Sequence, residues 1–134
     1  MHRQREATVG QARSQLALGN LDKAAKLFEY VASAKEWRGE ATALSLYYLG
    51  EIAVKQGDLP KGIAFFQRVF VSQVRYTEWV AKAYLASGQA FEALDKKPEA
   101  AATYREMLKN KRLQDRPELS VARTRLQALD PTSS

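Results

Sequence analysis

The sequence predicts an all-α fold in which three helical hairpins stack side by side and a further helix caps the array. Small residues recur at a fixed interval, because Gly50 and Gly88 are 38 residues apart (88 minus 50), as are Gly19 and Gly57 (57 minus 19). After each turn, an aromatic residue follows a small residue by four positions: these pairs are Ala24 and Phe28, Gly62 and Phe66, and Ala100 and Tyr104. Such a period is typical of stacked helical units that cover one another's apolar faces.

The first two hairpins are expected from their apolar stripes and turn residues. Helices at about 5–18 and 21–34 form the first hairpin, and the second of them has apolar residues at three-and-four spacing. In the second hairpin, a helix at about 39–56 is followed by a Gly-Asp-Leu-Pro turn. Pro60 then stands in the first turn of the next helix, where its missing N–H costs nothing.

The third hairpin and the cap follow the same logic. A helix at about 76–94 precedes a turn, and the next helix starts near Pro98. A final helix at about 117–129 has one apolar stripe and one polar face, which suits a helix that covers the end of a stack. The chain, 1–134, is therefore expected to be a single domain with repeats at about 5–34, 39–72 and 76–110.

A second set of residues is expected to pack the repeats together. A small side chain lets two helices approach closely, and a large ring fills the space beside it. The residues expected in this role are Ala12, Ala24, Phe28, Gly50, Gly62, Phe66, Gly88, Ala100 and Tyr104.

These residues resemble the tetratricopeptide repeat, whose pattern has a small residue in the first helix and Ala-x3-Phe in the second. The resemblance covers roughly residues 5–110 and implies a right-handed superhelix that binds proteins without enzymatic activity. The chain departs from the pattern in its longer period, in Thr8, Leu46 and Tyr84 at the Trp position, and in Gln15, Ala53 and Phe91 at the Tyr position.

The composition and motifs of the chain argue against a catalytic, cofactor or metal site. The chain has no Cys and one His, His2, at a terminus expected to be mobile, and it has no phosphate-binding glycine loop or paired-His spacing. Asp22, Asp58 and Asp95 recur at the turns, where helix capping explains them. We therefore expect no enzyme, no cofactor and no metal site.

No apolar run approaches the roughly 18 residues of a membrane span, and the polar opening lacks a signal-peptide apolar region. The sequence as written is expected to be soluble. Arg3–Glu6 already resembles the shoulder of a helix, which favours a fragment of a longer protein and leaves the compartment open between cytoplasm and periplasm.

The resemblance implies a concave groove lined by the first helix of each hairpin. Its expected partner-binding residues are Arg13, Leu44, Tyr47, Glu51, Lys55, Lys82, Leu85 and Gln89. The carboxylate clamp of chaperone-binding relatives is not reproduced, because Val9, Arg13 and Tyr48 stand at its Lys and Asn positions.

Tyr47 has two interpretations. Its ring is of a kind enriched at interfaces, while Tyr48 could serve the packing role; alternatively, both tyrosines are buried between repeats. Arg13, Lys55 and Lys82 could together hold a partner's carboxylate, although solvated surface charge explains them as well.

Two other functions stay open. The weak first repeat favours a self-assembly module that forms a homodimer or stacks end to end. The net charge of +6 suggests nucleic-acid binding through the basic C-terminal region, but acids are interspersed there and no base-reading code is visible, which makes nucleic acid the weaker alternative.

The extended period and the phrase Phe-Gln-Arg-Val are also similar to repeats of bacterial cell-envelope proteins, including periplasmic coordinators of the Tol–Pal system and outer-membrane assembly lipoproteins. That similarity implies a scaffold for a larger protein complex.

Overall fold

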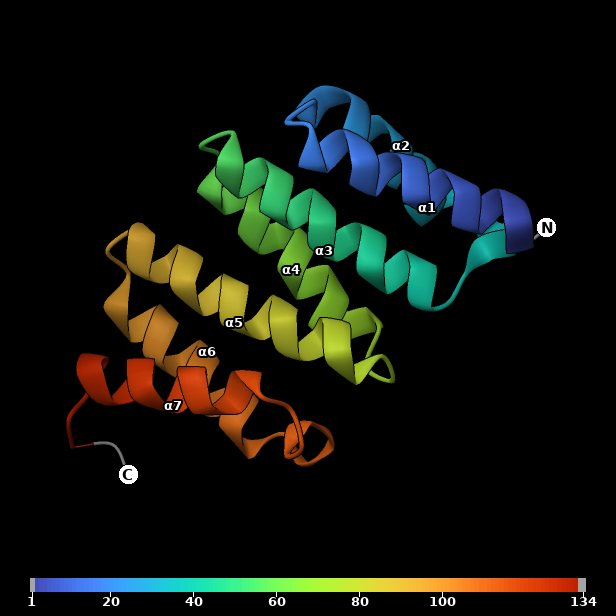
Figure 1. Cartoon of the computed structure of the whole chain (residues 1–134). Coiled ribbons are helices and arrows are strands. Elements are labelled where there is room, and N and C mark those ends of the chain that lie inside the picture. The colour runs from blue at the N-terminus through green and yellow to red at the C-terminus, as the bar shows by residue number, and fades with distance from the viewer. Residues whose placement is uncertain (1, 133–134) are drawn as a thin grey trace.

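The structure is a computed structural model that describes residues 2–132, with side chains from residue 3 onward, and seven α-helices occur within these residues. The helices are α1 (His2–Ala17), α2 (Leu21–Ser33), α3 (Glu40–Lys55), α4 (Leu59–Ser72), α5 (Thr77–Ala93), α6 (Lys97–Lys109) and α7 (Glu118–Leu129). No strand occurs among the described residues. Figure 1 shows three successive hairpins, α1–α2, α3–α4 and α5–α6, with α7 closing the C-terminal end.

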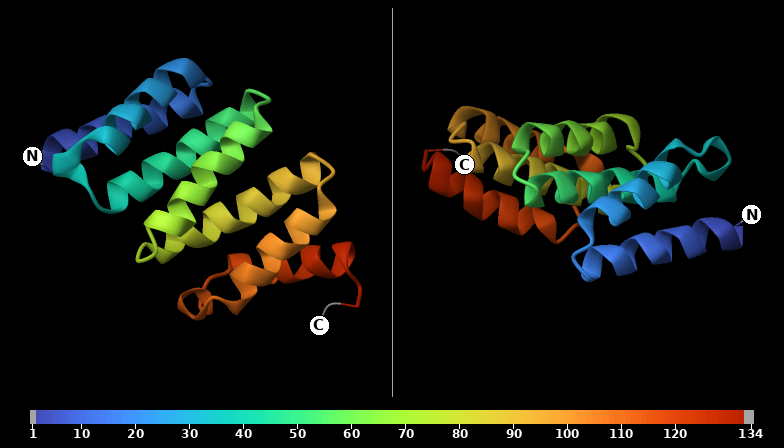
Figure 2. Two further views of the ribbon diagram at one scale, coloured as in Figure 1. Left: turned by 180° about the vertical axis from the view of Figure 1, so that it is seen from behind. Right: turned by 90° about the horizontal axis from the view of Figure 1, so that it is seen from above.

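The hairpins form two curved layers. One layer holds α1, α3 and α5 and the other holds α2, α4 and α6, as the view from behind in Figure 2 makes clear. In the view from above, α1 and α7 bend toward the same side, so the layer of first helices is concave. The expected superhelix of three hairpins and a capping helix is confirmed.

Most predicted helix bounds lie within about two residues of the observed ones, which is the usual precision. The exception is α1, which begins at His2 rather than near residue 5. Two short 3₁₀ turns, Lys35–Trp37 and Lys111–Leu113, were not predicted. Each turn buries one apolar side chain: Trp37 in the connection from α2 to α3, and Leu113 in the connection from α6 to α7.

In the second and third hairpins, a glycine of the first helix lets the second helix pack closely against it. A Cβ atom built on Gly50 would lie 2.4 Å from Cε1 of Phe66, and one on Gly88 would lie 2.3 Å from Cε1 of Tyr104. Both rings are fully buried. Because real Cβ contacts are much longer than this, only glycine leaves room for the rings at these positions.

The remaining residues of the predicted packing set also lie in the interior. Gly62 is buried against Val54, because a Cβ atom there would lie 2.7 Å from the Cγ2 of that side chain. Ala12, Ala24, Phe28 and Ala100 are all fully buried. In α1, Ala12 is the one buried side chain among those described, which agrees with its weak apolar spacing.

The prediction that Asp side chains cap the turns is correct only for Asp58. Its Oδ1 accepts a hydrogen bond of 3.2 Å from the backbone N–H of Lys61 at the start of α4. Asp22 lies inside α2 and instead accepts a 3.2 Å bond from Gln56 Nε2. Asp95 has a left-handed backbone, with φ of 58°, and follows α5 without capping α6.

Asp95 stands where the other two hairpins have glycine. Gly19 and Gly57 have φ of 83° and 86° at the corresponding ends of α1 and α3. A left-handed residue is the common way to end an α-helix, and Asp is one of the few non-glycine residues that tolerate it. The left-handed backbone conformation therefore recurs at this position in all three hairpins, although the residue type changes.

Within the described part of the chain, no helix combines the length and apolar character that crossing a bilayer requires.

Candidate functional site

Three aromatic side chains on two helices of the concave layer form a cluster, which we call the aromatic floor: Tyr47 and Tyr48 on α3 and Trp79 on α5. The ring centroid of Trp79 lies 5.7 Å from that of each tyrosine, and the two tyrosines are 5.4 Å apart. The tyrosines are half-buried and Trp79 is buried. The floor thus joins the first helices of two successive hairpins.

Neighbouring aromatic and acidic groups fix the orientation of these rings. Tyr48 stacks on Phe28 of α2 with centroids 5.1 Å apart, and Tyr47 lies 5.7 Å from Phe66 of α4. The indole Nε1 of Trp79 donates a 3.2 Å hydrogen bond to Glu40 Oε2. Each ring is held by a different element, so the floor is pre-organised.

Two cations lie over the floor. The guanidinium of Arg13, from α1, is 5.3 Å from the centroid of Tyr48, and Nζ of Lys82 is 4.8 Å from that of Trp79. Lys82 Nζ also pairs with Glu78 Oε2 at 2.8 Å. Cation–π contact directs these side chains onto the rings instead of into solvent.

The electrostatics agree with this arrangement. Burial raises the pKa of Tyr47, and the nearby carboxylate of Glu51 raises it further. The hydrogen bond from Lys82 lowers the pKa of Glu78, and the charges of Arg116 and Arg13 contribute. The carboxylate of Glu78 is therefore stabilised mainly by Lys82 on its own helix, with smaller contributions from α1 and from the segment before α7.

The structure brings only some of the predicted groove residues together. Arg13, Tyr47 and Lys82 meet at the aromatic floor. Lys55 is exposed two helical turns beyond Tyr48 on α3, so the predicted grouping of three cations is not assembled. Leu85 is half-buried and packs against the core.

The other predicted groove residues line two separate clefts. Glu51 and Gln89 line a cleft of about 120 Å³ between α3 and α5, to which α4 contributes Leu59 and Phe66. Leu44 lines a cleft of about 340 Å³ between α1 and α3, together with Val9 and Arg5. Along α3, the cleft with Leu44 lies on the N-terminal side of Tyr47 and Tyr48, and the cleft with Glu51 lies on their C-terminal side.

Sequence reasoning missed Trp79 and its partner Glu40. Nothing in the repeat pattern signals this tryptophan, because the residue at the equivalent place in the second hairpin is Ala41. It also missed Glu78, whose spacing of four residues from Lys82 on α5 was the available signal. Among the described residues, no group of three or more His, Cys, Asp or Glu side chains is arranged to hold a metal ion.

A family model described as Tetratricopeptide repeat matches residues 9–70, which cover most of the first two hairpins. Curated protein sequences yield no match. The matched segment contains Arg13, Tyr47 and Tyr48, so part of the aromatic floor and one of its cations lie within it.

Proposed function

Because the chain is a tetratricopeptide-repeat protein, and such repeats generally mediate protein–protein interaction, we propose that it binds a peptide or partner helix across the aromatic floor. Proteins of this family are typically non-enzymatic scaffolds. The observation that carries the proposal is the placement of Arg13 and Lys82 over Tyr48 and Trp79. Cations and aromatic rings fixed on a concave surface are a common basis for recognition.

The chemistry of the floor suggests what the partner offers. Arg13 is exposed while its guanidinium stays over a ring, so its N–H groups can still bind a carboxylate. The half-buried faces of Tyr47 and Tyr48 provide apolar surface beside this cation. We therefore expect a segment that combines an acidic side chain or C-terminus with an apolar or aromatic residue.

The floor also discriminates against some partners. The ammonium group of Lys82 is already paired with Glu78, and the indole N–H of Trp79 already donates to Glu40. A purely basic segment would meet these acids but would be repelled by Arg13 and Lys82, so we expect weak binding of such peptides.

Peptide selection followed by calorimetry tests the proposal. Peptides are selected from a displayed random library on the wild-type chain, and the affinity of one purified peptide is measured for Arg13→Ala. The matched control is Arg68→Ala on α4, because Arg68 makes the same kind of contact, 5.8 Å over Phe65, in the other layer. We expect Arg13→Ala to weaken binding about tenfold and Arg68→Ala to change it less than twofold.

Equal losses in both variants, or selected peptides that shift only the amide NMR signals of α2, α4 and α6, would contradict the proposal. Light scattering over a tenfold concentration range must accompany the titration. If the mass doubles with concentration and the dimer no longer binds the peptide, the floor is a self-association surface instead.

A further inference from the structure

We infer that the outward face between α6 and α7 binds an acidic amphipathic helix of a partner protein. We call this surface the basic end face, and its lining residues are Arg105, Leu108, Lys109, Arg123, Leu126 and Gln127. It is separate from the aromatic floor, with which it shares no residue, so this inference goes beyond the function proposed above.

The position of α7 leaves this face open. α7 packs on α6 and touches α5, just as α5 packs on α4 and touches α3. α5 is then paired with α6 in its own hairpin, whereas no helix within residues 2–132 pairs with α7 in the same way. The result is a cavity of about 590 Å³ along two neighbouring helices.

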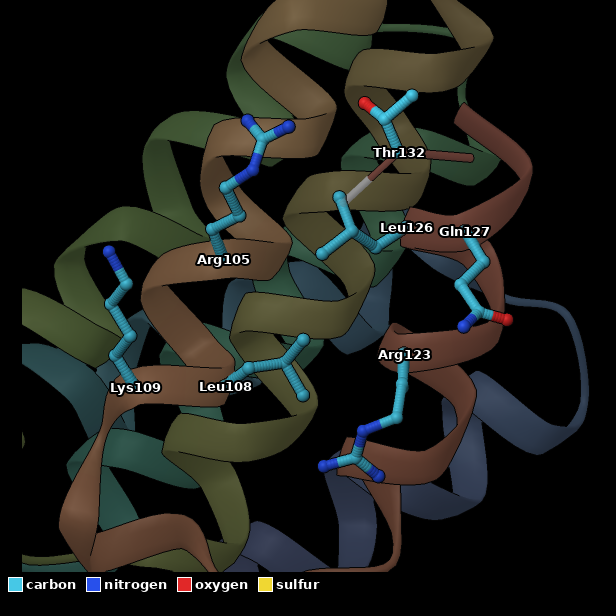
Figure 3. Close-up of a pocket in the computed structure, with 7 residues that line it drawn as sticks. All are labelled: Arg105, Leu108, Lys109, Arg123, Leu126, Gln127 and Thr132. Carbon is cyan, nitrogen blue, oxygen red and sulfur yellow. The ribbon is translucent and has the colours of Figure 1, made fainter. Parts of the chain in front are cut away.

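The floor of the basic end face is apolar. Figure 3 shows the side chains of Leu108, from α6, and Leu126, from α7, extending toward each other across the cavity. Leu108 is half-buried and Leu126 is buried, so their exposed edges form a narrow apolar strip. A groove between two helices with such a strip suits the apolar stripe of a third helix.

The rim is cationic. Arg105 and Lys109 lie one turn apart on α6, and Arg123 lies on α7 across the cavity (Figure 3). In the part of the chain that the structure describes, Lys109 and Arg123 contact no carboxylate within ion-pair distance. Acids spaced three or four residues apart on a partner helix would match the spacing of these cations.

The chain itself shows that this rim accepts a carboxylate. Arg105 Nη2 donates a hydrogen bond to Asp130 Oδ2, which belongs to the segment after α7. In that segment, Thr132 also lines the cavity, and its backbone N–H and hydroxyl both donate to Asp130 Oδ1. An acidic side chain from the chain's own tail therefore already occupies one edge of the basic end face.

Fluorescence anisotropy with a designed peptide tests the inference. The probe is a fluorescein-labelled helical peptide of about 18 residues, long enough to be helical, with a Leu stripe flanked by Glu; its companion has every Glu replaced by Gln. The test variant is Lys109→Glu with Arg123→Glu. The control is Lys23→Glu with Lys26→Glu, two exposed cations on α2 that change the net charge equally.

We expect the test variant to weaken binding of the Glu peptide at least tenfold, the control to change it less than about threefold, and the Gln peptide to bind at least tenfold more weakly than the Glu peptide. Thermal melts establish that both variants fold, and a Lys109→Gln, Arg123→Gln variant repeats the test without charge reversal. Arg13→Ala should leave this affinity unchanged, which separates the result from that of the aromatic floor.

Several outcomes would overturn the inference. Equal losses in the test and control variants would mean long-range charge attraction alone. A single-stranded oligonucleotide of the same charge that competes equally, and is equally sensitive to the test variant, would assign the face to nucleic acid. Dimerisation of the chain that the test variant abolishes would assign it to a second copy.

Discussion

The hydroxyl of Tyr104 donates a 2.5 Å hydrogen bond to Oε2 of Glu92, and this contact links the packing of the third hairpin to the docking of α7. Arg125 Nε, from α7, donates to the same carboxylate oxygen at 2.7 Å and to the Tyr104 oxygen at 3.2 Å. The Tyr104 ring is also the one that fills the space beside Gly88. Glu92 therefore connects α5 to both α6 and the capping helix α7.

Glu92→Gln should make the stability of the protein less dependent on pH. Burial alone would raise the pKa of Glu92, but hydrogen bonds from Arg125 and Tyr104 outweigh it and lower the pKa. Stabilisation by a carboxylate with a lowered pKa is present above its unfolded pKa and is lost as pH falls through its folded pKa. We expect the variant to lose about 1–3 kcal/mol of unfolding free energy at pH 7, and the difference to shrink below about pH 4.

Urea unfolding of both proteins at neutral and acidic pH measures this difference. Glu99→Gln, at an exposed position in the first turn of α6, is the control. A deficit for Glu92→Gln that is the same at every pH would show that the carboxylate does not stabilise the cap through its charge.

Gly88→Ala should destabilise the protein more than Gly50→Ala. Both new methyl groups would collide with a buried ring, which costs about 1–3 kcal/mol against a gain of up to about 1 kcal/mol in helix propensity. The Tyr104 ring is also tied to Glu92 and cannot shift without disturbing α7, whereas Phe66 carries no such hydrogen bond. Thermal unfolding monitored by circular dichroism measures the order of the two variants.

Gly10→Ala is the matched control for these two glycines. Gly10 lies inside α1, and a Cβ atom there would have no heavy atom within 4 Å. This variant should therefore be stabilised by up to about 1 kcal/mol. If Gly50→Ala and Gly88→Ala are also stabilised, the close approach of the rings is not a constraint on the fold.

Gly57→Ala and Asp95→Gly should have opposite effects on stability. Gly57 has φ of 86° and open space around it, so the alanine methyl meets only backbone strain, of about 1–2 kcal/mol. Asp95 has φ of 58°, and glycine would remove its strain at the cost of a more flexible unfolded chain. We expect Asp95→Gly to gain up to about 1 kcal/mol in chemical denaturation; a loss would show that the Asp side chain stabilises this turn.

The 38-residue period of the sequence predicted the hairpins because their packing repeats. The contact of Gly50 with Phe66 recurs as that of Gly88 with Tyr104, so the same residue pattern occurs twice in the sequence. What occurs once leaves no such pattern. Trp79 has no counterpart in the other hairpins, and the partners of Arg125 depend on how the single capping helix is rotated. The aromatic floor and the basic end face combine repeated and unique residues, which is why sequence patterns drew attention to single residues such as Tyr47 but to neither surface as a whole.

The sequence left open whether Tyr47 packs in the core or contacts a partner, and two substitutions separate these roles. Its ring lies between Phe66 and Trp79, so Tyr47→Ala should lower the free energy of unfolding by about 2–4 kcal/mol. Tyr47→Phe keeps the ring and should cost less than about 1 kcal/mol of unfolding free energy.

If the hydroxyl of Tyr47 contacts the partner, Tyr47→Phe should nevertheless weaken binding of the selected peptide severalfold in calorimetry, since a buried polar contact would lose its donor. An unchanged unfolding midpoint for Tyr47→Ala would show that the ring does not stabilise the core. Unchanged binding by Tyr47→Phe would show that the hydroxyl does not contact the partner, and Arg13 and Lys82 would then be the contacts to test.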